Sequence, residues 1–284
     1  MAPDNGPRNY FDFICAKTFA VSSQPPKDTS KSLICSSIQA NLYTVKISIV
    51  VPAFNEERLL GESLARIRLA AGAFQQRGWA TELIVCDNNS TDKTAQIARA
   101  AGATVVFEPV NQIARARNRG ADAAAGDWLL FVDADSHPCA ELFTDVANAI
   151  DSGRCLAGGA TIAMDKKYWL AGLITRLWNF TSRWRRLLAG SFIFCETATF
   201  RKIGGFSQEL FAGEELELSE RLRKAAKDTG KRIVILHRHP LLTSARKLHL
   251  YTFREHFRLL TRLFRDRRVL ANREACHLWY DGRR

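Results

Sequence analysis

The feature that most constrains the fold of this chain is a regular alternation of short apolar runs and helical stretches, which begins at Lys46. Ile47–Val51 is β-branched and ends at Pro52, which predicts a buried strand followed by a turn. The predicted strands are Ile47–Val51, Leu83–Cys86, Thr104–Phe107 and Trp128–Val132, and the predicted helices between them are Glu56–Gly72, Thr91–Ala101 and Ala114–Ala125. This alternation predicts an α/β fold with a mostly parallel central sheet flanked by helices on both faces.

The second half is less regular and predicts a smaller extension of the same sheet. We expect strands at Cys155–Met164 and Arg232–Leu236, a strand pair over Ser191–Phe200, and helices at Trp169–Leu188, Glu214–Lys227 and Tyr251–Phe264. Residues 1–45 show no sustained periodicity, and Asp12 and Lys17 interrupt their apolar run. We therefore divide the chain into a loose N-terminal extension (1–45), a catalytic domain (46–248) and a basic amphipathic C-terminal helix and tail (249–284).

Charge and cysteine content restrict the partners and the compartment. The net charge of +12 favours an anionic partner, namely nucleic acid, an acidic lipid surface or phosphorylated small molecules. No nucleic-acid recognition motif accompanies this charge, so we expect no nucleic acid. The seven cysteines form no Cys-x-x-Cys pair, and Cys86, Cys155 and Cys195 lie in apolar runs, which predicts buried thiols in a cytoplasmic protein. The uncharged apolar stretches are too short for a membrane-spanning helix.

Acidic residues follow three of the predicted strands at the point where each strand ends. Glu56 follows the first strand, Asp87 the second, and Asp133 and Asp135 the fourth. Ligands of open α/β sheets bind at this carboxyl edge, so we expect these side chains to converge on one crevice. Converging carboxylates repel unless a cation joins them, which favours Mg²⁺ or Mn²⁺ bridging to phosphate oxygens. No Gly-x-Gly-x-x-Gly and no Walker-type loop follows the first strand.

The order and spacing of several short strings resemble the family-2 inverting glycosyltransferases, which have the GT-A fold. The strings in the nucleotide-binding half are Ile49-Val-Val-Pro-Ala-Phe-Asn-Glu56, Asp87-Asn-Asn-Ser-Thr-Asp92, Ala116-Arg-Asn-Arg-Gly120 and Asp133-Ala-Asp135, and those in the acceptor half are Gly190–Cys195, Ile203-Gly-Gly-Phe206 and Gly213-Glu-Glu-Leu-Glu-Leu218. The resemblance covers about Lys46–Arg246. It implies a GT-A sheet with a smaller acceptor-side extension.

The resemblance also implies residue roles. The donor-binding residues would be Pro52, Ala53, Asn55, Glu56, Asp87, Arg115, Arg117, Asp133 and Arg246. Asp87 would accept an N–H of the nucleobase, and Arg115 and Arg117 would contact phosphate or base. Asp135, the second acid of the Asp-x-Asp motif, would coordinate the metal, and His237 or His239 would add a nitrogen ligand.

The base that takes the acceptor's proton would be Glu215, beside Glu214. Relatives carry Glu-Asp at this position, so the extra methylene of Glu215 shifts its carboxylate. The processive Gln-x-x-Arg-Trp motif is absent, which favours transfer of one sugar.

Several of these residues also have a simpler structural interpretation. Asp87 could cap the helix that starts near Ser90, and Glu56, Glu214 and Glu215 could be first-turn acids favoured by the helix dipole. Arg115 and Arg117 could form a solvated helical face, and the two histidines could be structural. These alternatives remain open at the level of sequence.

The resemblance implies metal-dependent, inverting transfer of a single sugar from a nucleotide-diphosphate sugar to a hydroxyl acceptor, with a lipid-linked acceptor as one candidate. Two alternatives remain, namely a nucleotide-sugar-binding relative without transferase activity and a nucleotidyltransferase.

Two amphipathic stripes have two interpretations, one of which involves a membrane surface. They consist of Trp169, Leu173, Leu177, Phe180, Trp184 and Leu187 in the first, and Phe253, Phe257, Leu260 and Phe264 in the second. In the simpler interpretation, both stripes cover the protein's own core. In the alternative interpretation, the stripes and their neighbouring arginines hold the protein peripherally on an anionic membrane.

Overall fold

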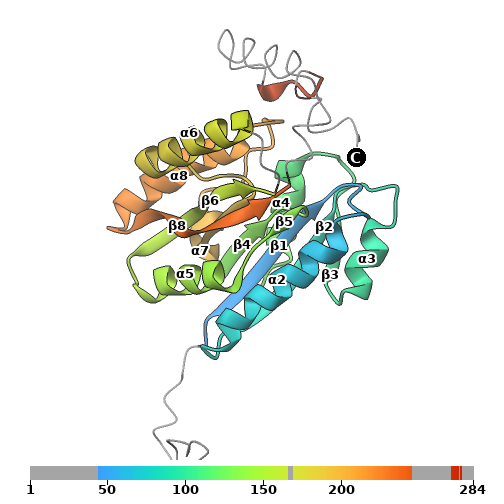
Figure 1. Cartoon of the computed structure of the whole chain (residues 1–284), viewed down its shortest axis with the longest axis horizontal. Coiled ribbons are helices and arrows are strands. Elements are labelled where there is room, and N and C mark those ends of the chain that lie inside the picture. The colour runs from blue at the N-terminus through green and yellow to red at the C-terminus, as the bar shows by residue number, and fades with distance from the viewer. Residues whose placement is uncertain (1–43, 166–168, 245–269, 275, 277–284) are drawn as a thin grey trace, which may run out of the picture. The chain divides into compact units, whose positions relative to one another are not determined.

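A computed structural model describes residues 44–165, 169–244, 270–274 and 276, which all belong to one compact unit, Thr44–Arg284. Its centre is a curled eight-stranded sheet (Figure 1). In spatial order the strands are β3 (Thr104–Phe107), β2 (Ala80–Asp87), β1 (Lys46–Ala53), β4 (Trp128–Val132), β7 (Phe192–Glu196), β6 (Cys155–Met164), β8 (Arg232–Thr243) and β5 (Ser136–His137). Only β7 and β5 run antiparallel to their neighbours, so the mostly parallel sheet is confirmed.

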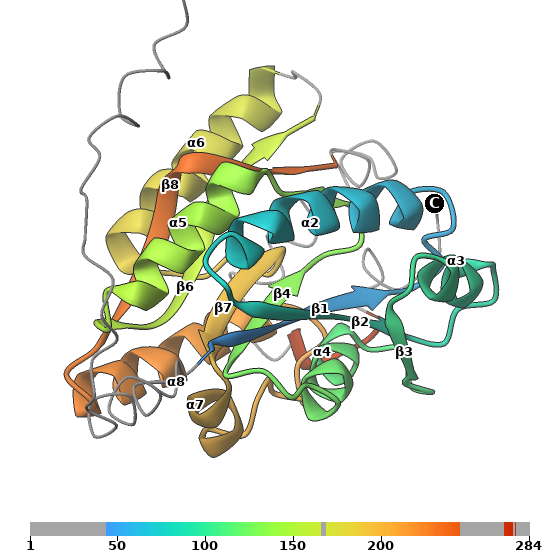
Figure 2. The same ribbon diagram turned by 90° about the horizontal axis from the view of Figure 1, so that it is seen from below.

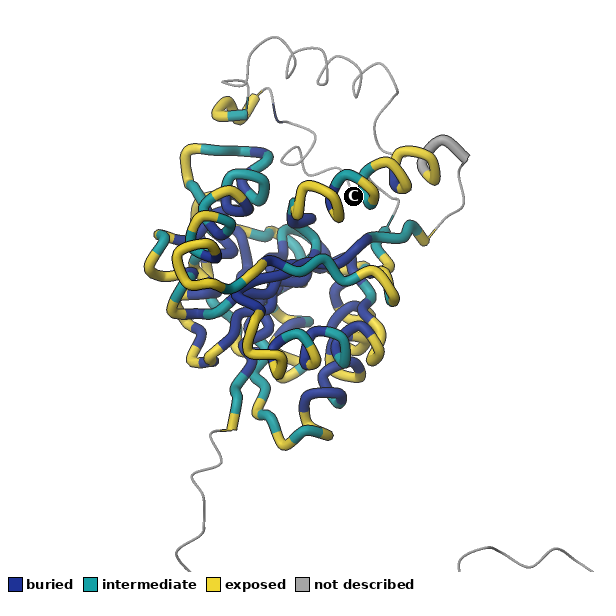
Figure 3. Tube along the Cα trace, turned by 90° about the vertical axis from the view of Figure 1, so that its left-hand side faces the viewer, coloured by how far each residue is buried: buried dark blue, intermediate teal, exposed yellow. Residues whose placement is uncertain are grey.

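Helices cover both faces of the sheet, as expected (Figure 2). The helices α2 (Leu60–Gln75), α3 (Thr94–Ala100) and α5 (Ala140–Asp151) pack into one apolar core, and α4 (Ile113–Asp122), α7 (Thr197–Lys202) and α8 (Glu214–Asp228) pack into the other. The remaining helix, α6 (Trp169–Arg185), lies against β6. The central strands β1, β4 and β7 are buried almost throughout, and the buried segments lie in the interior of the chain trace (Figure 3). Gly120 lets α4 approach β1 closely, because a Cβ there would lie 2.3 Å from Cγ1 of Val50.

The register of the parallel strands aligns their carboxyl ends. Ala53 pairs with Asp87 across β1 and β2, and Val50 pairs with Phe131 across β1 and β4. The residues that follow these three adjacent strands therefore lie at one edge of the sheet, where the sequence predicted a site.

Two local predictions in the second half were wrong. The predicted strand pair over Ser191–Phe200 is instead β7 followed by the short helix α7, because the partner strand β4 begins at Trp128, opposite Glu196, and offers no pairing beyond it. β8 continues past Leu236 to Thr243 after a register shift opposite Ala160 and Ile162. The helix α5 was not predicted. The helix expected at Tyr251–Phe264 lies outside the described residues.

The cysteine prediction is confirmed for Cys86, Cys155 and Cys195, which are all buried. Burial raises the pKa of the Cys86 and Cys155 thiols to about 12, so they are inert at neutral pH. Within the described ranges, no helix has the length and apolar character needed to cross a membrane.

Candidate active site

The loops that follow β1 and β2 are joined to each other by hydrogen bonds. Asn55 has a left-handed backbone (φ 50°), and its side-chain Oδ1 accepts a hydrogen bond from the Thr91 N–H at 2.8 Å. The Asn55 N–H donates to Ser90 Oγ at 3.0 Å, and the buried Asp87 accepts from the Ser90 N–H at 3.0 Å. Asp87 thus shapes the turn before α3. Asp87 does not cap the helix; the first N–H of α3, that of Thr94, donates to Asp92 Oδ1 at 2.9 Å.

Glu56 is buried beside these two hydrogen-bonded loops. Its N–H donates to Thr94 Oγ1 at 2.8 Å, and the next N–H, of Glu57, donates to Asp92 Oδ2 at 3.1 Å. Partial burial opposes ionisation of Asp92, but hydrogen bonds from Thr94 and Glu57 outweigh it and lower the Asp92 pKa. The backbone of Ala53, after the buried Pro52, accepts the Asn88 N–H at 2.8 Å. These hydrogen bonds join the residues at the carboxyl ends of β1 and β2 into one polar surface, and we call Asn55, Glu56 and Asp87 with their neighbours the polar shelf.

Arg117 of α4 lies at the centre of a buried charged cluster. Its side chain is 2% exposed and donates to Glu214 Oε1 at 2.7 Å, to Asp133 Oδ1 at 3.0 Å and to the Gly190 carbonyl at 2.7 Å. Its guanidinium lies 5.2 Å from the centroid of the Phe206 ring. Burial lowers the pKa of Arg117, but the neighbouring carboxylates outweigh it and raise the pKa above its ordinary value. Arg117 is therefore not part of a solvated helical face, and its expected contact with the donor stays a prediction.

Glu215 lines a cavity of about 200 Å³ together with Asp133, Gly190 and Ser191. Glu214 is buried and paired with Arg117, whereas Glu215 is half-buried. Both are first-turn acids of α8, as the structural interpretation expected, yet they also face this cavity. Burial, and then the charge of Glu214, raises the pKa of Glu215 to about 8.

Residues from the C-terminal part of the chain pack beside this cavity. The Phe211 N–H donates to the Leu270 carbonyl at 2.7 Å, and Leu270 and Cys276 form a small apolar cluster with Phe211 and Ala212. The next residue, Gly213, has φ 73°, a conformation that favours glycine, and it starts α8 immediately before the two glutamates.

Arg115, the other predicted arginine, is engaged in a contact between loops. Its Nε donates to the buried Glu108 at 3.1 Å and its Nη1 donates to Gln208 Oε1 at 2.9 Å. Gln112 makes a second link to this region, because its amide donates to the carbonyls of Gln208 and Leu210. Sequence analysis missed Glu108 and Gln112, although Glu108 follows a predicted strand in the same way as Asp87 does.

The acids at the end of β4 suit a metal ion that is shared with a phosphate ligand. Asp135 is buried, while Asp133 has one oxygen taken by Arg117. Nowhere in the described ranges do three His, Cys, Asp or Glu side chains gather into a metal-binding group. One or two carboxylates with phosphate oxygens are a common way of holding Mg²⁺, so this donor set fits a shared ion but not an all-protein cage.

The predicted nitrogen ligands lie elsewhere. His237 was expected at the end of a strand, but it is an exposed residue inside β8. It lines a cavity with Arg154 and Arg232, which lie where β6 and β8 begin, away from the carboxyl ends of the strands. The register shift of β8 accounts for the error, because the strand resumes after it. His239 contacts Asp145 at 3.0 Å. Arg246 lies outside the described residues.

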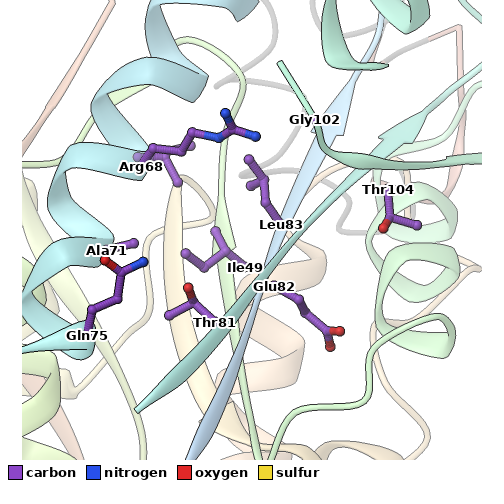
Figure 4. Close-up of a pocket in the computed structure, with 10 residues that line it drawn as sticks. Ile49, Arg68, Ala71, Gln75, Thr81, Glu82, Leu83, Gly102 and Thr104 are labelled. Atoms are coloured by element: carbon purple, nitrogen blue, oxygen red, sulfur yellow. The ribbon is translucent and has the colours of Figure 1, made fainter. Parts of the chain in front are cut away.

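A cavity of about 420 Å³ between α2 and β2 is a poor candidate for the site (Figure 4). Its carboxylate, Glu82, is already bound by Lys46 Nζ at 2.7 Å, by the Ala125 N–H at 2.7 Å and by the Ser48 hydroxyl. These donors lower the pKa of Glu82 despite its partial burial, so this acid has a structural role.

Solved structures with the GT-A fold are similar to this architecture. A mannosyltransferase from Pyrobaculum calidifontis, in complex with GDP-Man and Mn²⁺, has a TM-score of 0.59 at 16% identity over 85% of this chain and 72% of its own. TarS 1-349 of S. aureus has a TM-score of 0.57 at 24% identity over 71% of this chain and 61% of its own. At these identities the likeness shows the fold alone.

The family of the chain follows from its amino-acid sequence. Residues 48–206, more than half of the chain, match the model of glycosyl transferase family 2, and the chain belongs to this family. An uncharacterised glycosyltransferase of Mycobacterium tuberculosis is 30% identical over 49% of this chain and 61% of its own length. Glucosyl-3-phosphoglycerate synthase of Mycolicibacterium smegmatis is 37% identical over 31% of this chain. The chain spans only 61% and 30% of the lengths of these two relatives.

Proposed function

We propose that the protein transfers one sugar from a nucleotide-diphosphate sugar to a hydroxyl acceptor, with inversion at the anomeric carbon and with a divalent cation. The observation that carries the proposal is the charged cavity formed by Arg117, Asp133 and Glu215, next to the acids at the ends of β1, β2 and β4. The shelf around Asn55, Glu56 and Asp87 would bind the nucleoside. Structural neighbours in complex with UDP-GlcNAc and with GDP-Man support a nucleotide-sugar donor.

In this mechanism Glu215 is the general base. The acceptor oxygen attacks the anomeric carbon and loses its proton to the Glu215 carboxylate, while the bond from that carbon to the diphosphate oxygen breaks. A pKa of about 8 makes Glu215 a good proton acceptor once it is ionised. Glu214 is less suited to this role because Arg117 holds its carboxylate at 2.7 Å.

Arg117 acts in this proposal as a positioning residue. It is almost fully buried, and its bonds to Glu214 and Asp133 fix the first turn of α8 against the end of β4. Asp135, with the free oxygen of Asp133, would hold Mg²⁺ or Mn²⁺ together with the donor's phosphates. When bound, such an ion neutralises charge that develops on the departing diphosphate. We also propose a phosphate contact for Arg246.

We further propose that the protein works at the cytoplasmic face of a membrane, where a lipid-linked hydroxyl acceptor would be presented. A nucleic-acid partner has no part in this proposal.

Thermal shift with nucleoside diphosphates and their sugars, with and without Mn²⁺, tests donor binding. Ion-dependent stabilisation that disappears in Asp135→Ala is the expected result. Product analysis then tests the transfer and its anomeric configuration. Glu215→Gln should keep donor binding and lose turnover, whereas Glu220→Gln, an exposed glutamate on the same helix, should keep both. Donor binding without turnover in the native protein would support the silent relative, and transfer of a nucleotidyl group would support the nucleotidyltransferase.

A further inference from the structure

Helix α6 exposes an unusually apolar side. Five large apolar residues, at relative positions 1, 2, 5, 8 and 12, follow one side of the helix and are between 57% and 72% exposed. They are Leu173, Ile174, Leu177, Phe180 and Trp184, and we call them the α6 stripe. The simpler interpretation of the sequence, in which this stripe covers the protein's own core, is therefore wrong for these residues.

The opposite side of α6, which faces the protein, is polar. Thr175 and Ser182 are buried there. The Asn179 amide both accepts from the Ile162 N–H at 3.0 Å and donates to the Ile162 carbonyl at 2.9 Å, and Ser182 donates to the Leu187 carbonyl at 2.6 Å. The two bonds between Asn179 and Ile162 of β6 fix the rotation of the helix, because rolling it to bury the stripe would break them. The usual arrangement of a surface helix is thus reversed, which marks an interaction site.

A cluster of arginines lies at the C-terminal end of the same helix. Arg183 and Arg186 line a cavity of about 400 Å³ together with Arg154 and Arg232, and we call these four the arginine cluster. The cavity lining contains no carboxylate, and in the part of the chain that the structure describes none of the four forms an ion pair. Four like charges around one cavity favour an anionic ligand.

We infer that the α6 stripe and the arginine cluster together form a docking surface for an anionic lipid bilayer. The stripe would enter the boundary between head groups and acyl chains, and the arginines would bind lipid phosphates. A second copy of the chain could bury the stripe, but it would bring two arginine clusters of the same sign into the assembly. A free phosphate would occupy the cluster and leave the stripe exposed. An anionic membrane accounts for both features.

The docking surface is connected directly to the active site. The chain continues from Arg186 through Leu188 to Gly190 and Ser191, which line the cavity beside Glu215. Its purpose, delivery of a lipid-linked acceptor, rests on the proposed function. Docking itself can be measured without donor, metal or acceptor, so the two proposals can fail separately.

Vesicle flotation at low salt tests the inference, with phosphatidylcholine vesicles that contain or lack phosphatidylglycerol. The native chain should float only with the anionic vesicles. Combining Arg183→Gln, Arg186→Gln and Arg232→Gln should weaken binding by roughly a hundredfold, since each basic residue near such a surface contributes about fivefold. A triple variant of the stripe, Leu177→Ser, Phe180→Ser and Trp184→Ser, should abolish flotation.

Matched controls lie on α2, where Leu69 is 73% exposed and Arg66 is also exposed. Leu69→Ser and Arg66→Gln should leave flotation unchanged, and all variants should keep the ion-dependent stabilisation by nucleoside diphosphate. The inference is overturned if the native chain does not bind anionic vesicles, or if the controls lose as much binding as the two triple variants. A dimer in solution that the stripe variant dissociates, seen by light scattering, would also overturn it.

Discussion

Replacing Arg117 with Met removes the buried cation that joins α4, β4 and α8. The guanidinium donates to Glu214 at 2.7 Å and to Asp133 at 3.0 Å, and the side chains of Arg117 and Glu214 are only 2% and 4% exposed. Removing one partner of a buried pair typically costs about 3–5 kcal/mol, because the remaining charge is left without compensation. Asp133 is 22% exposed and adds less, since water can reach it.

We therefore expect Arg117→Met to lose about 3–5 kcal/mol of unfolding free energy. For a domain of this size that loss corresponds to a fall in Tm of roughly 6–20 °C, at about 2–4 °C per kcal/mol. Circular dichroism during heating and urea titration at pH 7 would measure it. Arg119→Met is the matched control, because Arg119 lies exposed on the same helix. It should change stability by no more than about 0.5 kcal/mol.

The cause can be separated from a simple loss of packing. Adding Glu214→Gln to Arg117→Met removes the uncompensated carboxylate, so the double variant should regain part of the lost stability. Acidification, which neutralises carboxylates, should also narrow the gap between Arg117→Met and the native protein. A loss below about 1 kcal/mol, or a Glu214→Gln cost that simply adds to that of Arg117→Met, would refute the reasoning.

Three further predictions concern the site and the fold. The pKa of Glu215 is raised to about 8, so turnover should rise with pH through about 8 as the base ionises; a flat profile would contradict its role. Because its folded pKa lies above the unfolded one, the stability that protonated Glu215 contributes is lost as pH rises through about 8, and Glu215→Gln should flatten that decline in Tm. Gly120→Ala places a Cβ 2.3 Å from Val50 and should cost about 1–3 kcal/mol in urea unfolding; unchanged stability would show that α4 can shift at little cost.

The strands and the acids that follow them could be predicted because both signals are local. Thr104–Phe107, Trp128–Val132 and Cys155–Met164 have the predicted bounds. A β-branched run followed by a turn needs no distant partner to be recognised, and parallel register then places Asp87 and Asp133 at one edge.

The charged cluster could not be derived in this way. Arg117 and Glu214 are 97 positions apart, and nothing local distinguishes a buried arginine from an exposed one such as Arg119. The position of His237 could not be predicted locally either, because it depends on a register shift between β6 and β8.

By itself, the sequence determined the alternation of strands and helices, the carboxyl edge that carries the acids, and the amphipathic pattern of α6. Tertiary structure alone decided that Arg117 bridges Asp133 and Glu214, and that α6 turns its apolar side outward. The physical reason is that periodicity along a helix shows that it has two sides, whereas the partner of each side depends on contacts with distant segments. For α6 those contacts are the hydrogen bonds between Asn179 and Ile162.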